Sequence, residues 1–413
     1  MKQSYLFTKT RKEAPSDEIA KNAQLLIRGG FIHKEMAGVY SFLPLGLRVV
    51  NKIIGIIREE MNAIGGQELH LTTLQDPDIW RASNRWSDEA VDNWFKTKLK
   101  SGGEVGLAFT HEEPLTRIMK DHIRSYKDLP FSAYQFQTKF RNEARAKSGI
   151  LRGREFLMKD LYSFSRDEKE HNEFYEKAKE AYQKIFARAG VGEKTHLTFA
   201  SGGSFSRYSH EFQTVTDAGE DTIHLCGKCS VAVNDEMIKD QPACPECGNK
   251  ELKKATSVEV GNIFTLGTRF SEALDLAYLD EKGEKQFVCM GSYGIGPGRL
   301  MGTIVELLAD EKGIVWPESV APFKMHLISL FGARGEGVKK EADALYEKLT
   351  KQGISVLYDD RDLRPGEKFA DADLIGIPTR VVVSEKTIEE GRYEVKKRCA
   401  KSGEMLSYAM LTA

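Results

Sequence analysis

The stretch FRNEARAKSGILRGREFLMKDLYSF, residues 140–164, decides how the rest of the sequence is interpreted. From residue 134 to residue 143, apolar and polar residues alternate, which is typical of an antiparallel strand with one face in a core. The apolar side carries Tyr134, Phe136 and Phe140, and the polar side carries Gln135, Gln137, Lys139, Arg141 and Glu143. A loop rich in glycine and arginine, residues 144–153, leads to a second extended run, residues 155–164, so the segment predicts a long β-hairpin.

Charged residues on the polar side of the first strand are candidates for ligand binding. The spacing of Arg141 and Glu143 predicts a cation and a carboxylate roughly 7 Å apart on one face of the strand. A guanidinium in that position can hold a phosphate, whereas charges on an open sheet face are in most cases simply solvated. These residues alone leave both interpretations open.

Composition limits the classes of protein to consider. A chain of 413 residues with 41% hydrophobic content is too long for one core, so we expect two or three domains. Because 60 Lys and Arg balance 61 Asp and Glu, no global basic field is present, and any RNA contact must use local patches. No apolar leader opens the sequence and no stretch of about 18 apolar residues occurs, which predicts a soluble cytoplasmic protein without a membrane partner.

Periodicity predicts two helices and a separate C-terminal domain. Apolar residues at steps of three and four after Pro44 predict a helix that ends at Gly65, with its stripe facing either the core or a partner subunit. A capping-box signature at Ser165 and Glu168 predicts a helix that runs to Ala189. Residues 200–255 are expected to be irregular. Beyond about residue 320, strands alternate with helices, which indicates an α/β domain, and the predicted strands are residues 325–330, 354–358 and 380–383.

Four of the six cysteines form two CxxC pairs separated by fourteen residues, namely Cys226, Cys229, Cys244 and Cys247. This spacing is typical of a zinc ribbon, and four thiolates leave no open coordination position, so the pattern favours structural Zn²⁺ over catalytic Zn²⁺. Unligated thiols are the alternative. The other two cysteines stand alone.

Two further segments each allow a structural and a functional interpretation. Residues 291–299, GSYGIGPGR, end in an arginine at the start of a predicted helix, which would place a guanidinium beside phosphate oxygens, although glycine runs also arise by chance. Thr110 and Glu113 have capping-box spacing for a helix that begins near Pro114. The same short segment also carries Glu112, which suits a cationic substrate group.

Taken together, these segments resemble the class II aminoacyl-tRNA synthetases, specifically the bacterial prolyl enzymes. Residues 140–164 resemble motif 2 of this class, residues 38–61 resemble motif 1, and residues 291–310 resemble motif 3. Residues 357–383 resemble the anticodon-binding domain of class IIa. The resemblance covers nearly the whole chain, with residues 214–256 outside the usual pattern.

The resemblance implies an ATP site and a proline site. The two catalytic residues would be Arg141, which holds the α-phosphate and the amino-acid carboxylate, and Arg299, which holds the γ-phosphate. The ATP site would be completed by Glu143, Phe156 and Thr268. The residues expected at proline are Thr110, Glu112, Arg141, Met158, Asp160, Tyr162 and Phe270. The chain departs from the bacterial pattern at Thr265, where a glutamine is usual, and at Asn262 within the sequence GNIF.

The resemblance also implies partners. The loop that contacts the acceptor end of tRNA in this family would contain Arg145 and Arg152, together with Lys147. The anticodon-binding domain would contribute Arg361, Arg364 and Lys368. The helix after Pro44 would lie at a homodimer interface, which reverses the preference for a core position. Because the interval between motifs 2 and 3 is short, we expect the large editing domain of the well-known bacterial enzymes to be missing.

The sequence therefore predicts an α+β protein with a class II antiparallel sheet flanked by helices. Residues 1–213 and 257–318 would form the catalytic domain, residues 214–256 a zinc-ribbon insertion with four cysteine ligands, and residues 319–413 an α/β anticodon-binding domain. The expected reaction is activation of L-proline by ATP with Mg²⁺ and transfer to tRNA(Pro). Two other functions stay open: a paralogue that modifies another acceptor, and a catalytically silent RNA-binding protein.

Overall fold

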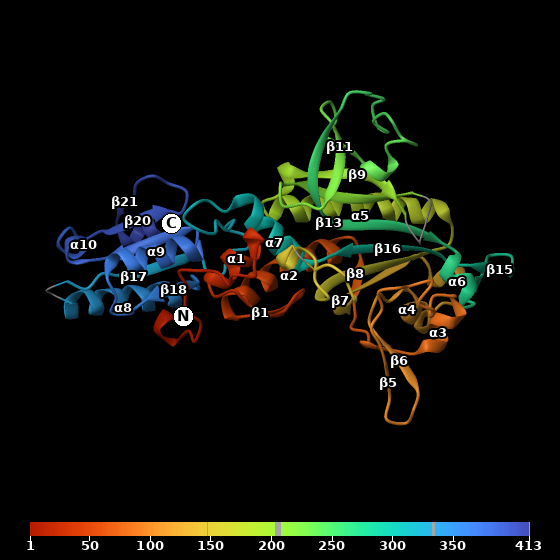
Figure 1. The fold of residues 1–413 in the computed structure, drawn as a ribbon, viewed down its shortest axis with the longest axis horizontal. Coiled ribbons are helices and arrows are strands. Elements are labelled where there is room, and N and C mark those ends of the chain that lie inside the picture. Colours follow the sequence, from red (N-terminus) through yellow and green to blue (C-terminus); the bar gives the residue numbers. More distant parts are fainter. Residues whose placement is uncertain (147, 203–207, 333–334, 413) are drawn as a thin grey trace. The chain divides into compact units, whose positions relative to one another are not determined.

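The computed structural model describes residues 1–146, 148–202, 208–332 and 335–412 (Figure 1). The chain divides into two compact units. The larger unit comprises Met36–Tyr40 and Ile54–Thr303, and the smaller one comprises Met1–Glu35, Ser41–Ile53 and Ile304–Ala413. In the described part of the chain, no helix is both long enough and apolar enough to cross a membrane.

The larger unit is built on a nine-stranded sheet that is mainly antiparallel. In spatial order, its strands are β10 (Tyr208–Val215), β9 (Thr195–Ser201), β12 (Ala232–Asn234), β11 (Asp221–Cys226), β13 (Leu252–Gly267), β16 (Cys289–Ile295), β8 (Glu155–Ser165), β7 (Phe131–Phe140) and β3 (Gly66–Glu68). Among these described strands, the β3–β7 and β9–β12 pairs are parallel and the others antiparallel. The predicted class of fold, an antiparallel sheet with flanking helices, is confirmed.

The predicted hairpin is the β7–β8 pair, with Phe131 opposite Phe164 and Phe140 opposite Glu155. Strand β7 ends at Phe140, so Arg141 and Glu143 lie in the loop just after it and not on its face, contrary to the prediction. The polar face is also not open to solvent, since Gln135 and Lys139 are fully buried. The segment that follows β3 lies against this face: the Gln135 side chain accepts a hydrogen bond from the backbone N–H of Leu71 at 2.9 Å.

Helices cover the two faces of the hairpin differently. Helix α5 (Glu168–Arg188) packs on one face, where the Lys159 ammonium donates to the Tyr182 hydroxyl at 2.6 Å. Asp167 and not Ser165 caps this helix, because its carboxylate accepts from the N–H of Glu170 at 2.9 Å. Since Lys159 points to α5, the neighbouring even-numbered residues of β8 point to the opposite face.

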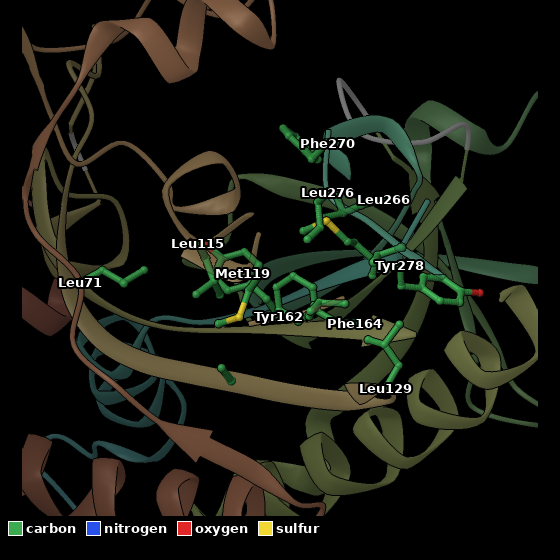
Figure 2. Close-up of a cluster of buried hydrophobic side chains, with 14 residues drawn as sticks. Leu71, Leu115, Met119, Leu129, Tyr162, Phe164, Leu266, Phe270, Leu276 and Tyr278 are labelled. Atoms are coloured by element: carbon green, nitrogen blue, oxygen red, sulfur yellow. The ribbon is translucent and has the colours of Figure 1, made fainter. Parts of the chain in front are cut away.

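On that opposite face, α4 (Glu112–Met119) packs in an apolar cluster (Figure 2). Leu115 and Met119 of α4 contact a cluster that includes Tyr162 and Phe164 of β8 and Phe270 of α6 (Arg269–Ala273). A smaller aromatic cluster around Trp80 and Trp94 joins α3 (Pro77–Ala82) to a three-stranded sheet formed by β4 (Leu74–Gln75), β6 (Glu104–Leu107) and β5 (Lys96–Lys98). These clusters fix the segment that carries Thr110 and Glu112.

Strand β13 links two parts of the sheet because it is 16 residues long. Its first part pairs with β11, and its second part pairs with β10 on one side and β16 on the other. Since β12 joins β11 to β9, the five strands β10, β9, β12, β11 and β13 close into a ring. The expectation that residues 200–255 are irregular is therefore wrong, because β10, β11 and β12 fall within them. Short strands with distant partners leave little periodicity in the sequence.

The smaller unit contains a five-stranded sheet in the order β18 (Val356–Asp359), β17 (Met325–Ser329), β19 (Thr379–Val383), β20 (Tyr393–Lys397) and β21 (Glu404–Leu406). The first three strands correspond to the three predicted strands and are parallel, and the last two are antiparallel additions. Its helices include α1 (Lys21–Arg28), α8 (Gly335–Lys351), α9 (Pro365–Ile375), α10 (Glu385–Glu389) and α11 (Tyr408–Thr412).

The helix predicted after Pro44 is α2 (Pro44–Ala63), and Gly65 follows it with a φ of 86° that favours glycine. Val50, Ile57 and Met61 of its apolar stripe are buried within the chain, whereas Leu47 is 49% exposed. Most of the stripe therefore belongs to the core of the chain itself, and Leu47 is its most exposed position.

Candidate active site

A cavity of about 240 Å³ lies in the larger unit beside the loop that joins β7 to β8. Its walls also include β13 and the start of α7 (Pro297–Leu308). It is lined by Arg141, Glu143, Ser148, Leu151, Arg152, Gly153, Phe156, Ala218, Glu220, Asp221, Val258, Glu259 and Arg299. Four of the residues predicted at ATP (Arg141, Glu143, Phe156 and Arg299) thus line one cavity.

Arg141 is held between two aromatic rings. Its guanidinium lies 5.0 Å from the ring centroid of Phe109 and 5.3 Å from that of Phe156. Its Nε atom is buried and has no hydrogen-bond partner among the described residues. Burial, together with the nearby Arg299 charge, lowers the pKa of Arg141. Because an unsatisfied buried donor is costly, this guanidinium is prepared for an anion that the chain itself does not supply.

Arg299 is fixed from three directions at the first turn of α7. Its Nε donates to the carbonyl of Leu151 at 2.8 Å, and its Nη1 donates to the carbonyl of Glu259 at 2.9 Å and to its carboxylate at 3.1 Å. Asn262 in turn donates to the other carboxylate oxygen of Glu259 at 2.7 Å. Sequence reasoning missed Glu259, although a lone acidic residue in the apolar run VEVGNIF was a usable signal. Asn262, noted as a departure, orients this carboxylate.

Glu143 does not stand free in the cavity. Its carboxylate accepts from Nε and Nη2 of Arg152 at 3.0 and 2.8 Å, and Arg152 also donates to Glu220 at 2.9 Å. These hydrogen bonds raise the pKa of Arg152, with the one to Glu220 contributing most. Arg145 is exposed and lines an adjoining hollow. Lys147 lies outside the described residues.

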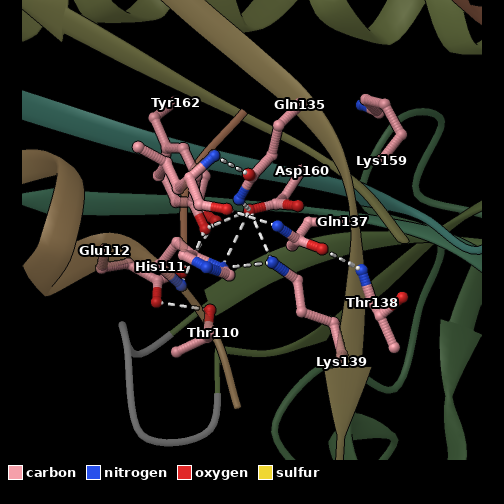
Figure 3. A network of polar contacts seen from close by, with 12 residues as sticks. Thr110, His111, Glu112, Gln135, Gln137, Thr138, Lys139, Lys159, Asp160 and Tyr162 are labelled. Carbon is pink, nitrogen blue, oxygen red and sulfur yellow. Dashed lines mark hydrogen bonds and ion pairs between the residues drawn. The ribbon is translucent and has the colours of Figure 1, made fainter. Parts of the chain in front are cut away.

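Thr110 and Glu112 meet directly at the start of α4 (Figure 3). The Thr110 hydroxyl donates to the Glu112 carboxylate at 2.5 Å, and Ser292 of β16 donates to its other oxygen at 3.1 Å. His111 is the N-cap residue of α4 and makes no side-chain cap, so the capping-box interpretation of Thr110 and Glu113 is wrong. Glu112 is only 2% exposed, and its nearest cation, Arg85, lies 3.9 Å away and pairs more closely with Glu113 at 2.9 Å, so the buried carboxylate is suited to receive a further cation.

Asp160 is the centre of a buried polar network behind Glu112 (Figure 3). Its Oδ2 atom accepts from Gln135, Lys139 and Tyr162, each at 2.9 Å, whereas Oδ1 is buried without a partner in the described part of the chain. Burial acts to raise the pKa of Asp160, but the charge of Lys139 and the hydrogen bonds from Gln135 and Lys139 outweigh it and the pKa is lowered. Burial lowers the pKa of His111 to about 4, so the imidazole is neutral at pH 7. The Tyr162 hydroxyl accepts from the N–H of His111 at 3.2 Å and ties the network to the Thr110–Glu112 segment.

The other residues predicted at proline and ATP have different positions. Met158 is half-buried on the same face of β8 as Asp160. Phe270 is fully buried and contacts Arg85, whose guanidinium lies 5.4 Å from its ring centroid and 3.9 Å from the Glu112 carboxylate. Thr268 donates to Glu272 and does not line the cavity, so its ATP contact stays a prediction.

Acidic residues also line the cavity. Asp221 and Glu259 line the cavity, and Gln213 donates to both Asp221 and Glu211, at 3.0 and 2.9 Å. Burial, followed by the charge of Glu259, raises the pKa of Glu211 to about 8. The raised pKa therefore reflects mainly the loss of solvent around this carboxyl and, second, the negative charge of Glu259.

The four cysteines of the CxxC pairs converge, as predicted. Their Sγ atoms all lie within 4.8 Å of one another, with 3.6 Å between Cys226 and Cys247 and 3.2 Å between Cys229 and Cys244. Zn²⁺ bonded to four thiolates at about 2.3 Å would separate the sulfur atoms by roughly 4 Å, so this arrangement fits a tetrahedral zinc site. The two knuckles would be the turn after β11 and the turn before β13.

The three residues predicted for anticodon binding differ in exposure. Arg364 is exposed at the N-terminus of α9. Arg361 forms ion pairs with Asp359 at 2.7 Å and Asp371 at 2.9 Å. Lys368 is fully buried, and its ammonium donates to the carbonyls of Ser329 at 2.6 Å and Asp359 at 3.3 Å, so it supports the ends of β17 and β18.

Comparisons with known families agree with this geometry. Residues 95–307 match the tRNA synthetase class II core domain (G, H, P, S and T), and residues 319–412 match the anticodon binding domain. Among solved structures, prolyl-tRNA synthetase of Giardia lamblia in complex with prolyl-adenylate superposes with a TM-score of 0.77 at 18% identity, over 94% of this chain and 75% of that one. The core domain and the cavity lined by Arg141 and Arg299 together define a class II aminoacyl-tRNA synthetase.

Curated relatives show to which family within this class the chain belongs. Proline–tRNA ligase of Geobacillus sp. (strain WCH70) is 34% identical over 548 aligned positions, covering 96% of both chains, and that of Geobacillus kaustophilus (strain HTA426) is 34% identical, covering 98% of this chain and 97% of the relative. The chain belongs to the proline–tRNA ligase family. The first alignment is longer than the 413 residues of this chain, so the relative carries segments with no counterpart here.

Proposed function

We propose that this chain uses ATP to activate L-proline as prolyl-adenylate and then transfers the prolyl group to the terminal ribose of tRNA(Pro). The observation that carries the proposal is the guanidinium of Arg141, which lies between Phe109 and Phe156 with its Nε buried and unsatisfied among the described residues. Attack of a carboxylate on the α-phosphorus requires positioning and charge neutralisation and no general base. A preorganised arginine supplies both.

The cavity residues would divide the ATP contacts. Arg141 would neutralise the α-phosphate and the proline carboxylate, Phe156 would stack on the adenine, and Arg299, held by Glu259, would meet the γ-phosphate. Glu143 would accept from the adenine amino group. Because Arg152 occupies the Glu143 carboxylate here, adenine binding would share or replace that partner.

Thr110 and Glu112 would bind the secondary ammonium of proline. That group has two N–H donors and one positive charge, and Glu112 is a buried acceptor already oriented by Thr110 and Ser292. Met158, Asp160 and Tyr162 would form the wall of the pocket. Phe270 would act indirectly, by packing against the Arg85 guanidinium that also faces Glu112.

Mg²⁺ would accompany ATP, and a structural Zn²⁺ would close the cysteine cluster. Asp221 and Glu259 present carboxylates to the cavity, and carboxylate oxygens together with phosphates are the ligands that Mg²⁺ prefers. Cys226, Cys229, Cys244 and Cys247 would hold Zn²⁺ with no open position, which gives the metal a structural and not a catalytic role.

For tRNA, the exposed residue Arg145, together with Arg152, would contact the acceptor end, and Arg361 and Arg364 would contact the anticodon.

We also propose a homodimer in the cytoplasm, with the exposed Leu47 side of α2 at the interface. We retain the division into a catalytic domain (residues 1–213 and 257–318), a ribbon insertion (214–256) and an anticodon-binding domain (319–413). Sedimentation equilibrium of the wild type and Leu47→Glu tests the dimer: loss of dimer in the variant alone is expected, and a monomeric wild type contradicts it.

We further propose that the chain does not edit alanyl-tRNA(Pro) by itself. In support, much of the stretch at residues 214–256 is taken up by β11, β12 and the cysteine turns, and the alignment with the Geobacillus relative is longer than this chain. A proline pocket rejects the smaller alanine by only about 1–3 kcal/mol, so mischarging is expected. Rapid deacylation of alanyl-tRNA(Pro) by the purified protein would overturn this part of the proposal.

The experiment for the whole proposal is aminoacylation of tRNA(Pro) with radiolabelled proline, compared with alanine and threonine. Charging with proline, with weaker charging by alanine, is the expected result. Charging of no amino acid, with tRNA binding intact, would favour the catalytically silent RNA-binding alternative.

A further inference from the structure

A second cavity, of about 680 Å³, lies in the smaller unit between the N-terminal segment, α1 and α9. Its lining contains six cations: Lys9, Arg11, Lys12, Arg28, Lys312 and Arg361. Three acidic residues also line it, namely Glu367, Asp371 and Asp373. Only Arg361 of these residues was part of the predicted site.

The positive charge in this cavity is largely uncompensated. Within the described ranges, the side chains of Lys9, Arg11, Lys12, Arg28 and Lys312 form no ion pair, although ion pairs are frequent elsewhere in the chain. The acids of the lining have other partners: Asp371 pairs with Arg361 at 2.9 Å, and Asp373 pairs with Arg380 at 3.3 Å. In a chain with a net charge of −1, five such cations around one cavity form a local basic patch of the kind that binds polyanions.

The N-terminal segment that supplies three of these cations is fixed to the domain. The amino group of Met1 donates to the carbonyl of Val356 at 2.8 Å, and the N–H of Tyr358 donates to the carbonyl of Met1 at 2.9 Å, so the chain start continues the edge of β18. Ser4 donates from its N–H and its hydroxyl to Asp360, at 2.9 and 2.7 Å.

A further contact holds the segment at the cavity itself. The Thr10 hydroxyl donates to Asp371 of α9 at 2.6 Å, which places Lys9, Arg11 and Lys12 beside the helix that follows Arg361 and Arg364. We call residues 1–12 the N-terminal strap. Since its backbone is docked, the cations are presented in a preorganised position and little ordering entropy opposes binding.

Exposed aromatic residues are followed along the strap by exposed basic residues. Tyr5 and Phe7 are 83% and 73% exposed, whereas Leu6 between them is buried. Lys9 and Arg11 continue the exposed odd-numbered positions. Exposed aromatic rings stack on unpaired bases, and lysine and arginine neutralise phosphates, so this pattern suits a single-stranded or looped RNA.

We propose that the N-terminal strap, with Arg28 and Lys312, forms a second wall of the tRNA-binding surface next to α9 and contacts the phosphate backbone of tRNA(Pro). The inference rests on the proposed function and extends it to residues outside the anticodon-binding domain at 319–412. The contacts are electrostatic and lie within the smaller unit, so they affect tRNA affinity and leave proline activation unchanged.

The test is the charge-reversal variant Lys9→Glu/Arg11→Glu/Lys12→Glu in the full chain. A matched control, Lys340→Glu/Arg392→Glu/Lys401→Glu, reverses the same kinds of charge at exposed positions of the same unit that do not line the cavity. For both, the KM for tRNA(Pro) and its dependence on salt are measured in aminoacylation, and proline-dependent pyrophosphate exchange reports the catalytic centre separately.

The strap variant is expected to raise the KM for tRNA(Pro) about 10-fold or more and to flatten the plot of log affinity against log salt by about 0.7–0.9 for each phosphate that is no longer neutralised. Pyrophosphate exchange stays at the wild-type rate. An unchanged KM and salt dependence, or an equal change in the control, would overturn the proposal. If charge reversal impairs folding, Lys9→Ala/Arg11→Ala/Lys12→Ala gives the same test with a smaller expected effect. Failure of pyrophosphate exchange in the wild type would instead reject the proposed function.

Discussion

The ammonium of Lys139 donates to the Oδ2 atom of Asp160 at 2.9 Å, and both side chains are buried, at 0% and 3% exposure. Tyr162 and Gln135 donate to the same oxygen, and the Tyr162 hydroxyl accepts from the backbone of His111. Through this chain of contacts, the ion pair supports the segment that presents Thr110 and Glu112.

Removing one partner of this pair is expected to be costly. Lys139→Met leaves the Asp160 charge buried without its cation, and breaking a buried pair typically destabilises a protein by about 3–5 kcal/mol. The double variant Lys139→Met/Asp160→Asn removes both charges and should regain part of that loss. Urea denaturation followed by tryptophan fluorescence measures the difference. Equal destabilisation by the single and double variants would show that the pair is not coupled.

Glu113 predicts a pH dependence of stability. Burial raises its pKa to about 7 from the usual 4.5, against the opposing effect of Arg85, so the folded protein holds this proton more tightly than the unfolded chain. The resulting stabilisation is complete below pH 4.5 and is lost as the pH rises through about 7. The Tm of Glu113→Gln relative to the wild type should therefore increase between mildly acidic and mildly alkaline pH, on either side of that pKa of about 7. A difference that is constant over this range contradicts the argument.

Glu112 is expected to determine affinity for proline. Glu112→Gln removes the charge that would meet the substrate ammonium, and the loss of a hydrogen bond to a charged group costs about 1.5–3 kcal/mol, or roughly 10–100-fold in affinity. The KM for proline in pyrophosphate exchange should rise by that factor, while the KM for ATP changes little. Glu113→Gln at neutral pH serves as the neighbouring control. A similar rise in both KM values would assign Glu112 a general structural role.

The cysteine cluster predicts bound zinc. Protein purified without chelators should contain about one zinc ion per chain, because four thiolates within reach of one ion form a closed tetrahedral site. Cys244→Ser should lose the metal and become sensitive to protease between β11 and β13. Metal analysis by mass spectrometry and limited proteolysis check the two statements. Metal-free protein with a protected ribbon would contradict them, and Cys399→Ser, a cysteine outside the cluster, is the control.

The sequence predicts the local elements well where a strong period coincides with a turn signal. Such patterns predict the β7–β8 hairpin, the helix α2 before Gly65 and the first three strands of the smaller unit. The ring of β9 to β13 could not be predicted, because β12 has three residues and its partners lie far away in the chain. Burial was also misjudged at Lys139 and Lys368, since charged residues are rarely buried and only their tertiary partners account for it.

The residues of the candidate site were predicted more from the family resemblance than from residue patterns. Arg141 and Arg299 follow from motifs 2 and 3, but their relation to Glu259 and Phe109 arises only when β7, β13 and α7 fold together. The capping-box interpretation of Thr110 had the correct spacing and was wrong, because the preference for a cap was overridden by the contact of Thr110 with Glu112.

Proline-dependent pyrophosphate exchange by the wild type, Arg141→Ala and the control Arg145→Ala shows whether Arg141 organises adenylate formation. Arg145 is exposed in the adjoining loop and serves tRNA in our account, so it should not affect activation. We predict exchange with proline that falls by at least about 100-fold in Arg141→Ala, as expected when a preorganised electrostatic interaction with the transition state is removed, and stays unchanged in Arg145→Ala. Exchange that survives in Arg141→Ala, or wild-type protein that shows none, would contradict the claim that Arg141 organises adenylate formation.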